Sequence, residues 1–309
     1  MMSTQRVAVV QAGSTLFDTP KTLERMQAHC EELQRLGVQL AVFPEAYVGG
    51  YPKGLDFGAR VGTRSAKGRN DYERYWSASI EVPGPEVQRI GAMAKQANAY
   101  FVVGVIERDG STLYCTALFF DPQGALLGKH RKLVPTASER LIWGMGDGST
   151  MPVLGTPFGK IGAVICWENY MPALRMTMYS KGIQLYCAPT VDEREIWQSS
   201  MRHIAYEGRC FVLSACQYLR RSDCPGEYDC IQGNAPETEL IRGGSVIVNP
   251  LGEVLAGPEY GRETILTADI DLTDTVRGKY DLDATGHYAR PEVFSLIVDE
   301  REKRSVTRS

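Results

Sequence analysis

Three reactive side chains stand at the ends of short apolar segments of the chain, namely Glu45, Lys132 and Cys166. A side chain at the carboxyl end of a buried strand in an α/β sheet lies where ligands bind. A thiol with a pKa of roughly 8.5 is mostly protonated at neutral pH, and a neighbouring base and cation raise its reactive thiolate fraction. The three residues therefore predict an activated nucleophile, with Cys166 as the attacking group.

Each of these residues also has an ordinary structural interpretation. Cys166 alone fits a buried core cysteine, Glu45 a solvated loop glutamate, and the basic run 128–132 a solvated face. The polar residues that directly follow the cysteine, Glu168 and Asn169, favour the catalytic interpretation.

Histidine could replace glutamate as the base, as in papain-like enzymes. His130 lies two residues before Lys132 and would share its strand face, so we expect it to support the catalytic residues rather than to contact the substrate. His29 and His203 fall on predicted helices and His287 lies near the C-terminus, which indicates structural roles.

A metal site is a further alternative. Cys210, Cys216, Cys224 and Cys230 could supply ligands, together with His203. Their spacings do not resemble the C-x₂₋₄-C pairs of zinc sites. We therefore expect structural thiols, with no metal and no cofactor.

The composition is that of an ordinary globular protein. Of 309 residues, 43% are hydrophobic and 23% are charged, which excludes disordered and fibrous classes. The net charge of −3 and the pI near 5.9 leave no basic field to attract nucleic acid or anionic lipid. No apolar run approaches the roughly 20 residues that span a membrane. Eight irregularly spaced cysteines without a secretory signal indicate reduced thiols in the cytoplasm.

Short apolar runs alternate with segments of helical period, which indicates an α/β fold. In the first helix we expect Thr19 as the N-cap and Gly37 as the terminator, and we expect Gly208 to end the last helix. The expected strands are 7–10, 40–43, 100–106, 126–132, 161–165, 183–187 and 211–216, and the expected helices are 19–36, 85–97, 172–180 and 193–207.

Two segments resemble each other, residues 117–124 and 245–252. Each is a predicted strand that leads into an Asp/Asn-Pro-x-Gly turn, so each is expected to form a hairpin in one of two related sheets. With no linker and no long repeat, we expect one domain over residues 1–270 and a C-terminal tail over 271–309 that joins subunit contacts. The polar stretches 49–70 and 220–239 are expected to be surface insertions.

Three ordered blocks of the sequence resemble the three signatures of the nitrilase superfamily, and further segments favour its nitrilase branch over its amidase and carbamoylase relatives. The resemblance runs from Val7 to about Leu296 and covers nearly the whole chain. The three blocks are Phe43-Pro44-Glu45-Ala46, residues 130–136 with Glu139-Arg140, and residues 166–172, and the further segments are 49–54, 66–69, 143–149 and 287–294.

The resemblance implies a four-layer α-β-β-α sandwich with two packed mixed sheets, assembled as a homodimer or a larger homo-oligomer, often a spiral. Carried over by position, Cys166 would be the nucleophile and Glu45 the general base. Lys132 would face the developing negative charge, and Glu139 would orient Lys132 or the substrate.

The activity implied is that of a thiol hydrolase, which converts an organic nitrile to a carboxylic acid and ammonia through thioimidate and thioester intermediates. We expect Tyr51, Trp143, Trp167, Tyr170 and Thr190 to bind the substrate. Such an aromatic wall would accept aliphatic, arylaliphatic or β-cyanoalanine-like nitriles. A hydratase-type reaction that stops at the amide, an amidase on the same fold, and a non-catalytic assembly subunit are the alternatives.

Overall fold

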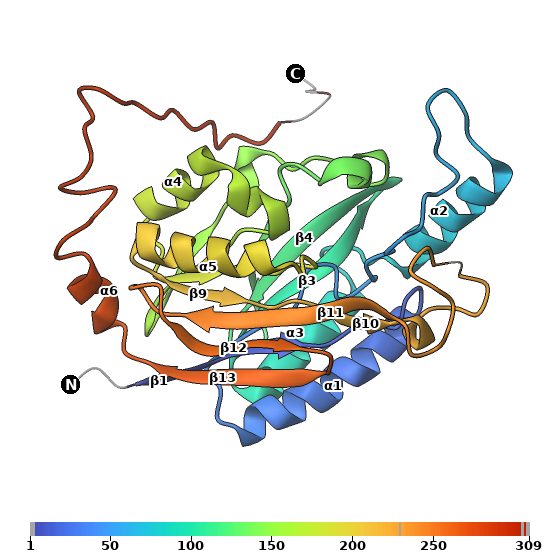
Figure 1. Cartoon of the computed structure of the whole chain (residues 1–309), viewed down its shortest axis with the longest axis horizontal. Coiled ribbons are helices and arrows are strands. Elements are labelled where there is room, and N and C mark those ends of the chain that lie inside the picture. The colour runs from blue at the N-terminus through green and yellow to red at the C-terminus, as the bar shows by residue number, and fades with distance from the viewer. Residues whose placement is uncertain (1–3, 229, 304–305, 307–309) are drawn as a thin grey trace.

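The computed structural model describes residues 4–228, 230–303 and 306, and two β-sheets form the centre of this part of the chain (Figure 1). The first sheet has the strand order β13 (Thr264–Ile270), β1 (Gln5–Gln11), β2 (Leu40–Val42), β3 (Tyr100–Asp109), β4 (Thr112–Phe120) and β5 (Leu126–Arg131). The second has the order β10 (Tyr218–Arg220), β11 (Glu239–Val248), β9 (Phe211–Ser214), β8 (Leu185–Cys187), β7 (Gly159–Ala163) and β6 (Val153–Thr156), with β12 (Val254–Tyr260) also paired to β11.

The two sheets share one arrangement over six strands, and the second has β10 in addition, antiparallel to β11. In the first, β1, β2 and β3 are parallel, β13 is antiparallel to β1, and β4 and β5 continue the other edge as antiparallel strands. In the second, β7, β8 and β9 are parallel, β6 is antiparallel to β7, and β11 and β12 are antiparallel. The prediction of two related sheets is therefore confirmed.

Both predicted hairpins are present. The turns at 121–124 and 249–252 close β4 onto β5 and β11 onto β12. Gly124 and Gly252 take left-handed backbone conformations, with φ of +88° and +79°, which glycine adopts without steric cost.

Helices cover the outer face of each sheet. α1 (Thr19–Arg35) and α3 (Pro85–Ala97) pack on the first sheet, and α4 (Pro172–Ser180) and α5 (Glu195–Gly208) pack on the second (Figure 1). This is the predicted four-layer α-β-β-α sandwich. The other helices are α2 (Ala66–Ala78) and α6 (Thr273–Gly278), with short 3₁₀ helices η1 (Ala137–Leu141), η2 (Gly148–Thr150), η3 (Cys166–Tyr170) and η4 (Arg221–Asp223).

The central strands are buried and apolar on both faces, whereas β12 and β13 are largely exposed or half-buried. In β1, Val7 and Val9 point into the core between the sheets, whereas Ala8 and Val10 pack under the helices. A strand with two buried faces is expected to be a continuous apolar run in the sequence. Such runs were the signal from which these strands were predicted.

Several predicted boundaries were wrong. Asp18, not Thr19, caps α1, because its side chain accepts a hydrogen bond from the Lys21 N–H, while the Thr19 hydroxyl donates to the Ala78 carbonyl. α5 includes Gly208, and Arg209 takes the left-handed C-cap position. These two shifts are one residue each, α5 also begins two residues later than predicted, and several strand bounds differ from the predicted ones by one to three residues.

The two polar stretches differ from simple surface insertions. The first begins with buried glycines, Gly49 and Gly50, and ends inside α2. The second joins β10 to β11 through η4. Beyond α6 the described tail leaves the body of the protein, runs back across the α4 side and meets it again where Lys303 N–H bonds to Asp147 (Figure 1).

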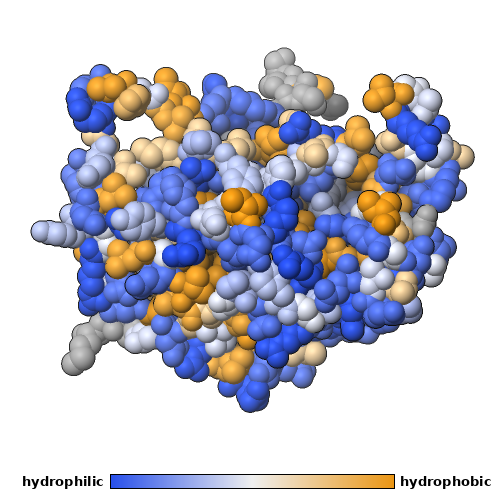
Figure 2. All heavy atoms as spheres, viewed as in Figure 1, coloured by the Kyte–Doolittle hydropathy of each residue, from blue (hydrophilic) through white to orange (hydrophobic). Residues whose placement is uncertain are grey.

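The face in Figure 2 is mainly hydrophilic, with apolar side chains scattered over it. No helix in residues 4–228 and 230–303 is long and apolar enough to cross a lipid bilayer.

Candidate active site

The segments after β2, β5 and β7 carry the three predicted reactive residues. Glu45 lies three residues after β2, Lys132 directly follows β5, and Cys166 opens η3 three residues after β7. The strand predicted over residues 161–165 has the expected length but begins and ends two residues earlier. The parallel strands of both sheets end at the end of the molecule where α2 lies (Figure 1).

Lys132 joins two carboxylates. Its Nζ lies 2.6 Å from Glu45 Oε1 and 2.8 Å from Glu139 Oε2, and Lys132 and Glu45 are fully buried. The same Glu139 oxygen accepts the Thr136 N–H at 2.6 Å, and its other oxygen accepts the Tyr51 hydroxyl at 2.9 Å. A buried ion pair is stable only when its remaining hydrogen-bonding capacity is filled, and here the surroundings fill that of Glu139.

The two oxygens of Glu45 differ. Oε1 accepts hydrogen bonds from Lys132 and, at 3.5 Å, from the thiol of Cys115. Oε2 is buried and has no hydrogen-bond partner of ordinary geometry among the described residues. The Cys166 thiol lies close enough to the carboxylate to lower its pKa by hydrogen bonding. One oxygen is therefore fixed, while the other is available to accept a proton.

Cys166 is held in a left-handed backbone conformation, with φ of 50°. Its N–H donates to the Pro189 carbonyl at 2.9 Å, and its sulfur accepts the Thr190 hydroxyl at 3.3 Å. Ala46, next to Glu45, and Ala137, two residues before Glu139, have φ of 50° and 47°. Such conformations are costly for residues with a side chain and cluster at functional sites.

The charges of the site are set by burial and by one another. Burial raises the pKa of Glu45, the Lys132 ammonium opposes that rise, and Glu139 adds to it. Burial disfavours the ammonium, yet the charges of Glu45 and Glu139 hold the pKa of Lys132 well above its usual value. Burial also raises the pKa of the Cys166 thiol well above its usual value, with Glu45 adding to the rise and Lys132 opposing it. The resting site thus pairs a neutral thiol with a carboxylate whose affinity for protons is increased.

Two of the predicted pocket residues line a cavity beside this cluster. Tyr51 and Trp143 pack edge to face with their rings 5.8 Å apart, and the Lys132 Nζ lies 5.5 Å from the Trp143 ring centre. With Glu139 they border a cavity of about 400 Å³, which residues 52–57 and Ile231 also line. The cavity therefore reaches the carboxylate that holds Lys132.

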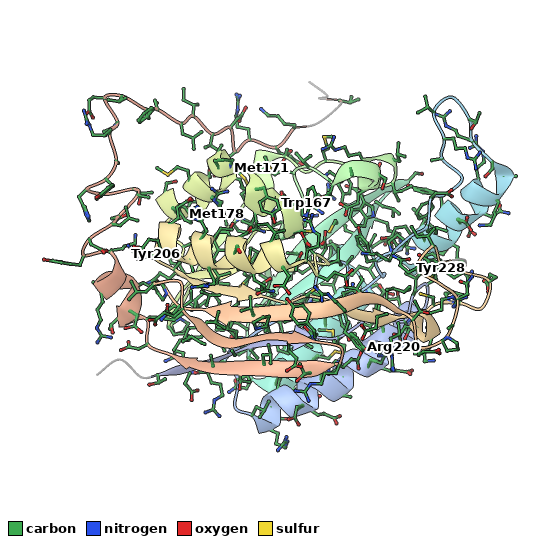
Figure 3. All side chains as sticks on the ribbon, in the orientation of Figure 1. Trp167, Met171, Met178, Tyr206, Arg220 and Tyr228 are labelled. Atoms are coloured by element: carbon green, nitrogen blue, oxygen red, sulfur yellow. The ribbon has the colours of Figure 1, made fainter. Side chains whose placement is uncertain are left out.

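Trp167 and Tyr170 lie on the outer side of η3. Their side chains are partly exposed and pack edge to face, with ring centres 5.8 Å apart. The Trp167 indole N–H donates to Asp192 at 2.8 Å, close to the start of α5 (Figure 3). Thr190, in contrast, is fully buried, and its hydroxyl donates to the Cys166 sulfur. The five predicted pocket residues thus occupy three different positions around the site.

His130 contacts Glu168 rather than the reactive groups. Its Nδ1 lies 2.6 Å from the Thr150 carbonyl and its Nε2 lies 3.0 Å from Glu168, and both partners only accept. Although burial disfavours the imidazolium, the charge of Glu168 and its hydrogen bond raise the pKa of His130. Glu168 also accepts the N–H groups of Leu133 and Ile165, so the histidine and glutamate tie the segment after β5 to the segment after β7.

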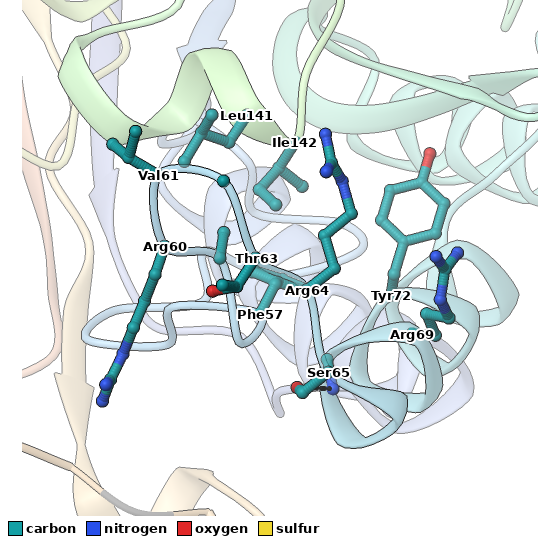
Figure 4. Close-up of a pocket in the computed structure, with 13 residues that line it drawn as sticks. Phe57, Arg60, Val61, Thr63, Arg64, Ser65, Arg69, Tyr72, Leu141 and Ile142 are labelled. Carbon is teal, nitrogen blue, oxygen red and sulfur yellow. Dashed lines mark hydrogen bonds between the residues drawn. The ribbon is translucent and has the colours of Figure 1, made fainter.

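A larger cavity, of about 660 Å³, lies beside the first one and shares Leu141, Ile142 and Phe57 with it. Figure 4 shows Val61 beside these side chains, while the guanidinium of Arg60 points away from them. The residues that line this cavity include neither a thiol nor a carboxylate. Its size therefore does not make it the centre of the chemistry.

The metal alternative finds no support in the geometry. No three His, Cys, Asp or Glu side chains in the described part of the chain are grouped so as to hold an ion. None of the eight cysteines forms a disulfide bond, and His203 pairs with Glu207 on α5.

Three residues beside the site were not predicted. Cys115 donates to Glu45, Gln217 donates to the Glu45 carbonyl at 2.8 Å, and Glu168 binds His130. Glu168, two residues after Cys166, could have been found from its place in the motif. Cys115 lies on β4 of the sheet that also carries Glu45, and Gln217 follows β9 of the second sheet. The strand order of the first sheet and the packing of the two sheets, respectively, place them near Glu45.

The sequence matches the carbon-nitrogen hydrolase family over residues 6–280. It is 58% identical to a nitrilase of Bradyrhizobium diazoefficiens, with 99% of this chain and 95% of that protein covered. It is 55% identical to a bifunctional nitrilase/nitrile hydratase of Lupinus angustifolius, over 98% of this chain and 88% of that protein. The fold is similar to that of Saccharomyces cerevisiae Nit3, a member of the nitrilase superfamily, with a TM-score of 0.71, 20% identity, and 93% and 97% of the two chains covered.

Proposed function

Because the chain belongs to the carbon-nitrogen hydrolase family, we propose that it hydrolyses an organic nitrile to the carboxylic acid and ammonia, with Cys166 as the nucleophile. The observation that carries the proposal is the buried pair of Glu45 and Lys132, with Oε1 and Nζ 2.6 Å apart, whose charges act on the buried thiol of Cys166. The identity above 50% with proteins named nitrilases supports nitriles as the substrate class.

In the first half-reaction the Glu45 carboxylate takes the thiol proton as the sulfur attacks the nitrile carbon. One electron pair of the C≡N bond moves to nitrogen, which Glu45 then protonates to give a thioimidate. Lys132 faces the nitrogen as its negative charge develops. An ammonium fixed in a buried site stabilises that charge more than it stabilises the uncharged nitrile, which lowers the barrier.

In the second half-reaction Glu45 deprotonates a water that attacks the thioimidate carbon. The tetrahedral adduct expels ammonia and leaves a thioester, and a second water releases the acid and restores the thiol. If the sulfur leaves the adduct first, the product is the amide. The position of Glu139 on Lys132 suits it to hold the ammonium in place through both halves.

Tyr51 and Trp143, which line the 400 Å³ cavity, are proposed to contact the substrate first. Trp167 and Tyr170 are proposed to bind the more distant part of the substrate, and the backbone N–H of Trp167 to donate to the anionic nitrogen. His130 is proposed to support the site through Glu168. No cofactor or metal takes part in these steps.

We further propose a cytoplasmic homo-oligomer in which residues 1–270 form the catalytic domain and 271–309 take part in subunit contacts. The tail exposes large apolar side chains, among them Tyr288, Phe294 and Ile297, at 64%, 78% and 91%. Apolar groups of that size are stabilised by burial against another surface. A second copy of this chain is the proposed surface, and a nitrile is the proposed small-molecule partner.

The test is ammonia release from a panel of aliphatic, arylaliphatic and amino-acid nitriles, with acid and amide products measured separately. We expect release by the wild type and a loss of roughly 10⁶-fold in Cys166→Ala, as when other covalent nucleophiles are removed. The matched control is Cys210→Ala, which removes a buried thiol from the core that α4 and α5 form with the second sheet. This variant should retain activity. Mass spectrometry should find a substrate adduct on Cys166. Turnover by C166A, or an adduct on another cysteine, would refute the proposal.

A further inference from the structure

The side chain of Thr190 has two hydrogen bonds, and both bear on Cys166. Its hydroxyl donates to the Cys166 sulfur at 3.3 Å, and its oxygen accepts the Asp192 N–H at 2.9 Å. The residue is fully buried, and its own N–H is bonded to the Ala215 carbonyl. The oxygen therefore accepts one backbone N–H while its proton is donated to the sulfur.

The turn that holds this hydroxyl is itself fixed. The Asp192 carboxylate accepts the Trp167 indole N–H and the Arg194 guanidinium, each at 2.8 Å. The Arg194 guanidinium also lies 4.8 Å from the Trp167 ring centre. Asp192 is thereby tied both to its own turn and to the residue after Cys166, so the hydroxyl and the sulfur are held by one connected group of side chains.

Thr190 occupies the position in the second sheet that Glu45 occupies in the first. After β2 the chain reads Phe43-Pro44-Glu45, and after β8 it reads Ala188-Pro189-Thr190. The first residue of each set bonds to the neighbouring parallel strand in the same way, Phe43 N–H to Val102 and Ala188 N–H to Leu213. The two sheets therefore bring a carboxylate and a hydroxyl from equivalent places to one sulfur.

The electrostatic surroundings give the hydroxyl a role. Burial raises the pKa of Cys166, Glu45 and Glu139 add to the rise, and Lys132 and the Thr190 hydrogen bond oppose it. Lys132 is already shared by two carboxylates. The other titratable groups whose charges interact with Cys166 are Tyr51, Tyr170, Arg194 and Cys216.

We propose that Thr190 is a further catalytic residue, whose hydroxyl donates a fixed hydrogen bond to the Cys166 thiolate as it forms and again when the sulfur leaves the product. Asp192 is the positioning residue that sets the direction of that bond. The reaction needs such a donor twice, because the sulfur carries negative charge before attack and on departure. The proposal rests on the function proposed above. It adds the Thr190 hydroxyl to the groups that act on the Cys166 sulfur.

The experiment compares Thr190→Val, which keeps the shape and removes the hydroxyl, with Thr190→Ser, which keeps the hydroxyl. Alkylation of residue 166 by iodoacetamide is followed by mass spectrometry as a function of pH, beside kcat and KM for a nitrile. We expect T190V to lower the alkylation rate at neutral pH about tenfold and to move its midpoint to higher pH. A hydrogen bond to a charged group predicts a fall in kcat of roughly 10- to 100-fold with little change in KM.

For T190S, kcat and the alkylation rate should remain within about threefold of the wild type, because the hydroxyl donor is kept. Thr177→Val, which removes a buried hydroxyl from α4, is the control for burial alone and should leave the pH profile unchanged. If T190V does not fold, Thr190→Ala against Thr190→Ser makes the same comparison.

A wild-type alkylation profile in a folded variant without the hydroxyl would overturn the proposal. Alkylation is measured on the sulfur whether or not nitriles are substrates. A shifted profile in a protein without nitrile turnover would therefore refute the proposed function and leave this inference standing.

Discussion

The two sheets have the same strand arrangement, yet they supply opposite chemistry to the site between them. The first sheet contributes the charged groups, Glu45 after β2 and Lys132 after β5. The second contributes the groups that are neutral at rest, Cys166 after β7 and Thr190 after β8. The thiol proposed as the nucleophile and the charged groups proposed to activate it thus come from different sheets and meet only when the sheets pack.

This difference shows that the repeated arrangement fixes where side chains emerge and not what they do. Glu45 and Thr190 follow equivalent strands behind equivalent prolines, but one can accept a proton and the other donates a hydrogen bond. A fold of two similar halves therefore offers equivalent positions on both sides of one substrate, and the residue types divide the work.

The largest effect expected in this comparison is that of Glu45→Gln. It keeps the shape and removes the base, so kcat/KM should fall by about 10³- to 10⁴-fold, near the upper limit for general base catalysis. Because burial raises the pKa of Glu45, wild-type activity should rise with pH through a value above the ordinary carboxyl pKa of about 4.3. The pH profile of kcat/KM measures both the size of the loss and the pKa of Glu45. In E45Q, the rise in activity with pH at the acidic end of the profile should be absent. A loss no larger than that of T190V would contradict the division of roles.

The next effect is that of Lys132→Met, which should lower kcat by about 10²- to 10³-fold through loss of charge stabilisation. It should also cost about 3–5 kcal/mol of unfolding free energy, because Glu45 and Glu139 would be left buried without a cation. Denaturant unfolding and ammonia release measure the two losses. Adding Glu139→Gln should restore part of the stability and none of the activity. Recovery of activity in the double variant would count against Lys132 as a catalytic group.

A smaller effect is expected from His130→Asn, which breaks the link between the segments that carry Lys132 and Cys166. Activity should fall by less than E45Q lowers it, and stability should fall by about 1–3 kcal/mol. The pKa of His130 is raised in the fold, so its contribution is complete below the ordinary value near 6.5 and is lost as pH rises through the raised value. The stability difference between wild type and H130N should therefore be larger at pH 6 than at pH 9. The exposed His203→Asn is the control, and a loss equal to that of E45Q would make His130 the base.

The smallest effect on activity is expected from alanine at the two hairpin glycines. Both have positive φ, which costs a residue with a side chain roughly 1–2 kcal/mol. A Cβ at Gly124 would also lie 2.7 Å from the Gly91 carbonyl oxygen, whereas at Gly252 the nearest atom, the Arg202 carbonyl oxygen, is 3.2 Å away. Thermal unfolding should thus show a larger loss for G124A than for G252A. Equal losses of stability would show that backbone strain in the turn, and not contact with the helix above it, determines the destabilisation. In neither variant should kcat per folded molecule change.

The sequence predicted what depends on local pattern. Glu45 and Cys166 could be found because each follows an apolar run, and the two hairpins because Asp/Asn-Pro-x-Gly fits one turn. The four layers followed from the family resemblance and agree with strands that are apolar on both faces. The roles proposed for Glu45, Lys132, Glu139 and Cys166 remain predictions that the geometry supports.

What the sequence could not supply depends on the order of the strands within each sheet and on how the two sheets pack. The thiol of Cys115 and the hydroxyl of Thr190 contact Glu45 and Cys166 across 70 and 24 residues of chain. The Asp18 cap was missed because Asp and Thr are both good N-caps and the two residues are adjacent in the sequence. Only the structure shows that the Thr19 hydroxyl donates to another segment, at the Ala78 carbonyl.

Two carboxylates share one ammonium in the wall of this site, so the wall has an excess of negative charge whenever both are ionised. A neutral nitrile enters such a place without penalty, but the anion formed from it is repelled as soon as the thioester is cleaved. We therefore expect the carboxylate product to bind more weakly than its nitrile, which would favour its release after each turnover.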